Sequence, residues 1–163
     1  MRAMVQARSE STREKVLEAA ERLVIEHGHQ NVSMKELVDL SGVSNGSIFH
    51  HFGSKDGVLQ AIFVRERRAY LGYIGQQVIA YQGDPCDALG AGAKAVIDFT
   101  ARSPERHFRL ISQFSFSEWM TENQQVWIDL TREVERPAIE WAAPHFAAPR
   151  HLGRITDRSL AER

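Results

Sequence analysis

Apolar residues recur at helical spacing near the start of the chain. Val16, Ala20 and Leu23 fall on one face of a helix predicted over residues 12–27, and glutamates occupy the other faces. Gly28 is expected to end this helix, because glycine tolerates the backbone conformation that follows a last helical turn. The pattern predicts an amphipathic helix that buries one side.

Two short helices are predicted to follow. Ser33 and Glu36 have the spacing of a capping box, in which each side chain satisfies a backbone amide at the start of a helix over residues 34–41. Gly42 then supplies a turn. The next helix is expected over residues 45–51.

The second short helix carries the most informative residues. Ser44 is its expected cap, and Ile48 and Phe52 are expected to point inward. The residues left for its outer surface are Asn45, Gly46, Ser47, Phe49 and His50. Asn, Ser and His side chains can hydrogen-bond base edges or phosphates, and glycine lets the backbone come close. Two short helices joined by a glycine turn predict a helix-turn-helix, although polar residues could equally decorate an exposed helix of an unrelated bundle.

The rest of the chain also reads as helical. A long helix is predicted from Ser54 towards Gly83. Later starts are expected at Asp84 with Pro85, at Ser103 with Pro104 and at a capping box of Thr121 with Gln124, and this last helix is expected to kink or end near Pro137. No alternating run of β-branched residues occurs. The predicted fold is all-α, with about seven helices.

Composition and charge limit the kinds of partner that the chain could bind. The 163 residues are 43% hydrophobic and 25% charged, typical of a globular chain. With 20 basic and 21 acidic residues, and 7 against 8 within residues 1–56, any nucleic-acid binding must rest on a local arrangement. The single Cys86 excludes an internal disulfide, no signal peptide is recognisable, and no apolar run could span a membrane. We expect a cytoplasmic protein with no membrane partner.

Motifs for catalysis and metal binding are missing. The sequence has no H-E-x-x-H, nucleophile elbow, Walker loop, G-x-G-x-x-G or Cys pair. His27 with His29, and His50 with His51, lack the helical spacing that aims two imidazoles at one metal. We expect no enzyme activity, no catalytic residues, no metal and no cofactor.

The segment from about Thr12 to Leu59 resembles the TetR (tetracycline repressor) family of bacterial transcription regulators. The most specific stretch is GVSNGSIFHHFGSKDGVL. The resemblance implies that Ser33 and Ser44 cap helices facing DNA, that residues 45–50 enter the major groove, and that Lys55 grips a phosphate. A lysine in the first turn of a helix opposes the helix dipole, which also favours a bound anion there. Without the resemblance, Lys55 could equally be a solvated lysine near Asp56.

Three positions depart from the family pattern. Phe49 stands where the family usually has tyrosine, so a hydroxyl contact to phosphate is absent. Val38 replaces a small alanine, and Gly57 replaces a better helix former. These departures concern individual contacts more than the overall role.

The carboxy-terminal half concentrates aromatic residues. They can be ordinary core, or they can line a cavity for a small apolar effector with His107, Gln113 or Glu118 as polar anchors. The candidate ligand-binding residues are Phe99, His107, Phe108, Phe114, Trp119 and Trp127. The charged run over residues 65–68 is expected to be a solvated face with local ion pairs, the alternative being an extra contact with the DNA backbone.

These observations predict a helix-turn-helix DNA-binding domain over residues 1–54 and a helical effector-binding and dimerisation domain over residues 55–163. The expected function is ligand-responsive regulation, as a repressor that binds double-stranded operator DNA as a homodimer and is released by the effector. The alternative is a helical protein-interaction module without sequence-specific DNA binding. The ending DRSLAER looks like an interrupted helix, so we expect either a carboxy-terminal truncation or pairing through the sixth and seventh helices.

Overall fold

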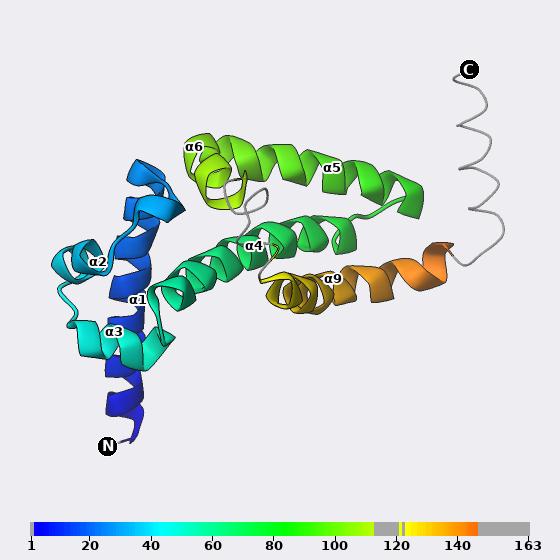
Figure 1. Cartoon of the computed structure of the whole chain (residues 1–163). Helices are drawn as coiled ribbons and strands as arrows, with labels where there is room; N and C mark the ends of the chain where they lie inside the picture. The colour runs from blue at the N-terminus through cyan, green and yellow to red at the C-terminus, as the bar shows by residue number, and fades with distance from the viewer. Residues whose placement is uncertain (1, 113–120, 122, 147–163) are drawn as a thin grey trace. The chain divides into compact units, whose positions relative to one another are not determined.

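The computed structural model describes residues 2–112, 121 and 123–146, and within them it is helical, with no strand (Figure 1). The α-helices are α1 (Arg2–His27), α2 (Met34–Ser41), α3 (Asn45–Phe52), α4 (Lys55–Ile79), α5 (Pro85–Arg102), α6 (Pro104–His107) and α9 (Gln124–Phe146). A 3-10 turn, His29–Asn31, follows α1, and a π-helical turn, Phe108–Ser112, follows α6. The predicted all-α class is confirmed.

The chain divides into two compact units. The first holds Met1–Arg67 with Ser103–Gln124, and the second holds Arg68–Arg102 with Gln125–Arg163. Helix α4 runs from the first unit into the second. The division follows contacts between helices, whereas the boundary predicted at residue 54 concerns function and stays a prediction.

In the first unit, α2 and α3 pack against α1 (Figure 1). Val16 and Val24 of α1, Leu37 of α2 and Ile48 of α3 are completely buried. Burying an aliphatic side chain of this size contributes roughly 1.5–3 kcal/mol. The apolar face predicted for the first helix therefore forms the core on which the two short helices are held.

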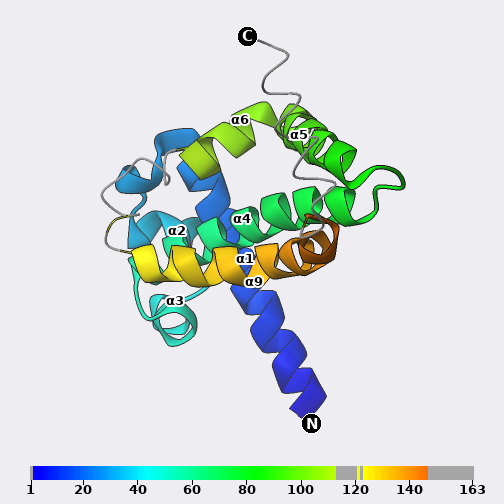
Figure 2. The same ribbon diagram turned by 90° about the vertical axis from the view of Figure 1, so that its right-hand side faces the viewer.

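Helix α1 is longer than the sequence analysis predicted. It begins at Arg2 rather than near residue 12, and its first turns extend beyond α2 and α3 (Figure 2). The segment MRAMVQARSE has no apolar face, which is why periodicity missed it, but it contains no Gly or Pro to stop a helix. The Thr12 hydroxyl donates to the Arg8 carbonyl at 2.9 Å within this extension.

Glycine ends two of the helices at the predicted places. Gly28 follows α1 with φ of 82°, and Gly42 follows α2 with φ of 66°. Positive φ is strained for residues with a Cβ, so these turns depend on glycine. The predicted bounds of α2 are confirmed, and α3 ends one residue later than predicted, at Phe52.

In the second unit, α5 and α9 both pack against the later part of α4. A Cβ on Gly92 of α5 would meet Val78 of α4 at 2.9 Å, and one on Gly75 of α4 would meet Ala138 of α9 at 3.9 Å. Tyr70 of α4 meets Phe99 of α5 edge to face, with ring centroids 5.4 Å apart. Small residues thus bring these helices close together.

Two predictions about α9 are wrong. The helix begins at Gln124, so Thr121 and Gln124 do not form its capping box. It also continues through Pro137 and Pro144, so the predicted end near Pro137 is wrong, whereas the alternative of a kink there stays a prediction. A proline inside a helix removes one hydrogen bond and costs about 3 kcal/mol. Tertiary packing offsets this cost: Val134 and Ala138 of α9 lie beside Gly72 and Gly75 of α4, and Leu130 of α9 is 3% exposed.

Candidate nucleic-acid interface

The start of α2 is fixed by a reciprocal pair of hydrogen bonds. The Glu36 amide donates to Ser33 Oγ at 3.2 Å, and the Ser33 amide donates to Glu36 Oε2 at 2.9 Å. The hydrogen bond from the Ser33 hydroxyl, with the one from its amide, holds the pKa of Glu36 below its usual value. The predicted capping box is confirmed, and it places Ser33 on the surface at one end of the helix-turn-helix.

The turn between the two short helices is held by side chains as well as by glycine. The Gly42 amide donates to the Val38 carbonyl at 3.0 Å. Ser41 Oγ donates to the Leu37 carbonyl and accepts from the Val43 amide at 3.2 Å. The sequence analysis missed Ser41, because a serine at the end of a helix matches no capping pattern.

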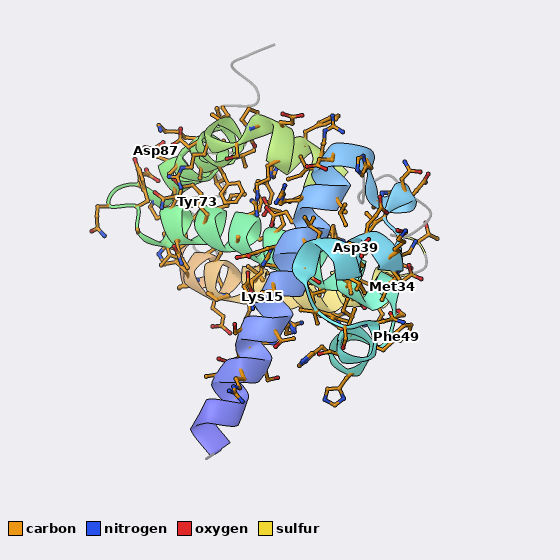
Figure 3. All side chains as sticks on the ribbon, turned by 90° about the vertical axis from the view of Figure 1, so that its left-hand side faces the viewer. Lys15, Met34, Asp39, Phe49, Tyr73 and Asp87 are labelled. Carbon is orange, nitrogen blue, oxygen red and sulfur yellow. The ribbon has the colours of Figure 1, made fainter. Side chains whose placement is uncertain are left out.

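Helix α3 begins as predicted and separates an inner from an outer side. Ser44 Oγ accepts from the Ser47 amide at 3.3 Å, which confirms the cap. Ile48 is completely buried, whereas Phe49 is 47% exposed on the outer side (Figure 3). Of the other candidate DNA-binding residues in this helix, Asn45, Gly46 and His50 are exposed and Ser47 is half-buried. The structure thus gathers the predicted residues of α3 on one exposed surface.

Lys55 is the first residue of α4 and is half-buried. Ser54 caps this helix, its hydroxyl oxygen accepting from the Gly57 amide at 3.0 Å. A Cβ on Gly57 would lie 2.0 Å from the Phe52 carbonyl oxygen. The departure from the family pattern at Gly57 therefore has a structural reason: the connection between α3 and α4 comes too close for a side chain.

The candidate ligand-binding residues are not gathered in one unit. Phe99 and Trp127 belong to the second unit and His107 and Phe108 to the first, where Phe108 is 67% exposed. Phe99 lies between two tyrosines of α4, with ring centroids 5.4 Å from Tyr70 and 5.7 Å from Tyr73. Phe114, Trp119, Gln113 and Glu118 lie outside the described residues.

The first unit also contains an ionic cluster that the sequence analysis did not predict. Glu66 of α4 is 2% exposed, and its Oε2 lies 2.6 Å from Arg106 Nη1 of α6. Arg106 also donates to Glu21 of α1, whose other oxygen accepts from Arg65 at 2.6 Å. Glu14 completes the cluster as a second partner of Arg65. The expectation of a solvated face over residues 65–68 is wrong, since two of its residues join α4 to α1 and α6.

The cluster shifts the ionisation of its members. Burial alone would raise the pKa of Glu21, but the hydrogen bonds and charges of Arg106 and Arg65 outweigh it and lower that pKa. Burial lowers the pKa of His107, and the charges of Arg67 and Arg106 add to this against the attraction of Glu66. The shifts in pKa thus favour the charged form of Glu21 and the neutral form of His107.

Within the described part of the chain, no group of three or more His, Cys, Asp or Glu side chains could hold a metal ion. Nor does that part contain a helix long and apolar enough to cross a membrane.

Comparison with known families identifies the segment that carries this surface. Residues 16–62 match the model of the amino-terminal domain described as bacterial regulatory proteins, tetR family. This segment carries the amino-terminal domain of the TetR family. The matched range contains the second part of α1, all of α2 and α3 and the start of α4, the elements whose geometry is described above.

The chain is also similar in sequence to named transcriptional regulators. The chain is 28% identical over 148 residues to the HTH-type transcriptional repressor AcnR of Corynebacterium diphtheriae, covering 89% of this chain and 68% of that relative. It is 33% identical over 67 residues to the HTH-type transcriptional regulator UidR of Escherichia coli K12, covering 41% of this chain and only 34% of that relative.

Solved structures of TetR family members share the fold. A TetR family transcription regulator from Shewanella sp. PV-4 matches with a TM-score of 0.70 at 21% identity, covering 83% of this chain and 70% of that one. Another, from Marinobacter aquaeolei VT8, matches with a TM-score of 0.68 at 20% identity, covering 85% and 72%. At this identity the likeness concerns the fold.

Proposed function

We propose that this chain is a transcriptional repressor that binds double-stranded operator DNA through α2 and α3. The observation that carries the proposal is the outer side of α3, where Asn45, Phe49 and His50 are exposed on a helix whose other side is locked into the core by Ile48. A rigid helix with exposed hydrogen-bonding groups fits the major groove. The relatives named as transcriptional repressor and transcriptional regulator support this reading.

The residues divide between positioning and base reading. In this proposal Lys55, at the start of α4, contacts a phosphate, and the caps at Ser33 and Ser44 orient the two helices. Asn45 and His50 have side chains that hydrogen-bond base edges. Phosphate contacts supply affinity for any sequence, whereas base contacts supply specificity.

The proposal is tested by binding at several salt concentrations, after footprinting the region upstream of the gene to find the operator. Lys55→Ala should weaken binding to specific and random DNA alike and flatten the salt slope by about one unit. Asn45→Ala or His50→Ala should instead cost about 1–3 kcal/mol at particular base pairs. If Lys55→Ala alters base preference with an unchanged salt slope, the assignment is wrong.

The same titration decides between the repressor and a helical protein-interaction module. A module that keeps only the fold should show no salt-sensitive preference for any upstream fragment over random DNA. A repressor should show a preference that Asn45→Ala and His50→Ala reduce.

The proposed repressor acts as a homodimer and responds to a small apolar effector. A two-fold dimer places its recognition helices about 34 Å apart, so a change in their separation abolishes operator binding. Within the described part of the second unit, Phe99 packs with Tyr70 and Tyr73, and this aromatic group supports an apolar ligand. A thermal-shift screen should find a compound that both stabilises the protein and releases DNA. Stabilising compounds that all leave operator affinity unchanged would count against the effector.

A further inference from the structure

Phe49 is a large apolar residue on the outer side of α3. Its side chain is 47% exposed, although α3 already fills the core with Ile48, which is completely buried. Phe49 follows Asn45 by four residues, so the two side chains lie next to each other on the outer side of the helix. The exposed part of the phenyl ring therefore lies beside the polar groups proposed to read bases, where it is available to the same partner.

Gly46 points to the same surface independently. A Cβ added to Gly46 would meet no atom within 4 Å, and its φ is not positive. The fold therefore has no need of glycine at this position, where helix propensity favours alanine. Unlike Gly57, which the chain's own backbone requires, Gly46 leaves the outer side of α3 open to close approach by something outside the protein.

We propose that Phe49 reads the 5-methyl group of a thymine in the major groove; this inference rests on the proposed operator binding and adds what one residue recognises. A phenyl ring has no hydrogen-bonding group, so it can gain nothing specific from a phosphate or from a polar base edge. The thymine methyl is the one apolar group that the major-groove edges present. Phe49 thus contributes its ring, rather than a hydrogen bond, to this contact.

The experiment replaces operator thymines, one at a time, with deoxyuridine, which keeps every hydrogen bond and lacks only the methyl group. At one position in each half-site, the wild-type protein should bind the deoxyuridine operator about fourfold more weakly, the effect of removing one buried methyl group. Substitution in both half-sites should multiply the two effects to about 16-fold, since separate sites are additive in free energy.

Three variants assign the effect to the ring. Phe49→Ala should bind the thymine and deoxyuridine operators equally, whereas Phe49→Tyr should still discriminate between them because it keeps the ring. Leu40→Ala is the matched control, since Leu40 is also apolar and 40% exposed but lies on α2, and it should discriminate like the wild type. If Phe49→Ala binds too weakly to titrate, Phe49→Leu takes its place and should show a reduced ratio.

The outcomes separate the two proposals. Sequence-specific binding in which no thymine replacement matters, or in which Phe49→Ala still discriminates at the same position, overturns the role of Phe49 alone. Loss of discrimination in Leu40→Ala as well would also overturn it, because the effect would not belong to the ring. Absence of any operator preference in the wild type overturns the proposed function, and this inference with it.

Discussion

The outer side of α3 and the ionic cluster lie in the same compact unit but are built in opposite ways. On α3, exposed side chains are set by contacts within four residues along the chain, such as the Ser44 cap on the Ser47 amide. In the cluster, the buried Glu66 and the half-buried Glu21 and Arg106 meet, although they are far apart in sequence. One region leaves its polar groups exposed, and the other pairs charged groups with each other.

This difference has an energetic consequence. Exposed polar groups on α3 remain hydrated in the free protein, so replacing them should change binding more than stability. A buried carboxylate such as Glu66 loses its hydration and depends on Arg106 for compensation. Substitutions in the cluster should therefore change stability first.

The largest expected effect is that of Arg106→Ala. It leaves Glu66 buried without its closest cation and also removes a partner of Glu21, so we expect a loss of about 3 kcal/mol in the free energy of unfolding. This value is at the low end for a broken buried pair because the Arg106 side chain is 36% exposed. Urea denaturation of the full chain measures it.

Arg109→Ala is the matched control for Arg106→Ala. Arg109 lies three residues further along and pairs with the exposed Glu105 at 3.5 Å. Breaking such a surface pair should cost less than about 0.5 kcal/mol. Equal effects of the two substitutions would mean that the cluster does not stabilise the unit.

The second effect is a loss of stability from a substitution in the connection between α3 and α4. Gly57→Ala places a methyl group against the Phe52 carbonyl oxygen, at 2.0 Å before any relaxation. The backbone must move to accommodate it, so we expect a loss of about 2 kcal/mol in stability, typical of overpacking. Thermal unfolding measures this loss, and an unchanged or raised melting temperature would contradict the assigned close contact.

The contrast between these regions also explains what could be predicted from sequence. The Ser33–Glu36 box, the Gly42 turn and the Ser44 cap are local patterns, and the structure confirms each of them. The role of Glu66 could not be found in this way, because a glutamate within a run of arginines looks solvated until α6 is placed beside it. The continuation of α9 through Pro137 was missed for the same reason, since its packing on α4 is a contact between distant segments.

The third effect is a pH dependence from His107. Its pKa is lowered in the folded state, mainly by burial, with Glu66, Arg67 and Arg106 as the charged groups around it. Below about pH 6.5 the unfolded chain therefore binds a proton that the folded chain does not, and stability falls as the pH falls towards the folded-state value. One such group gives a slope of at most about 1.4 kcal/mol per pH unit.

Urea denaturation between about pH 7.5 and pH 5 measures this slope. These two pH values lie roughly one to two units above and below the pKa of a free histidine. His107→Gln should flatten the profile in that range, because glutamine does not titrate. A variant profile parallel to that of the wild type would assign the pH dependence to other groups.

The smallest expected effect is that of Gly46→Ala, which should change stability and operator affinity in opposite directions. Gly46→Ala adds a methyl group that meets nothing within 4 Å, in the first turn of α3. Alanine is the better helix former, so the variant should be more stable than the wild type by about 0.5 kcal/mol. The same methyl group stands on the outer side of α3 and should keep the helix away from the major groove of the operator. Operator affinity should therefore fall while stability rises. Thermal unfolding and operator titration on one preparation decide this, and a stabilised variant that binds DNA as tightly as the wild type would show that α3 does not approach the groove at Gly46.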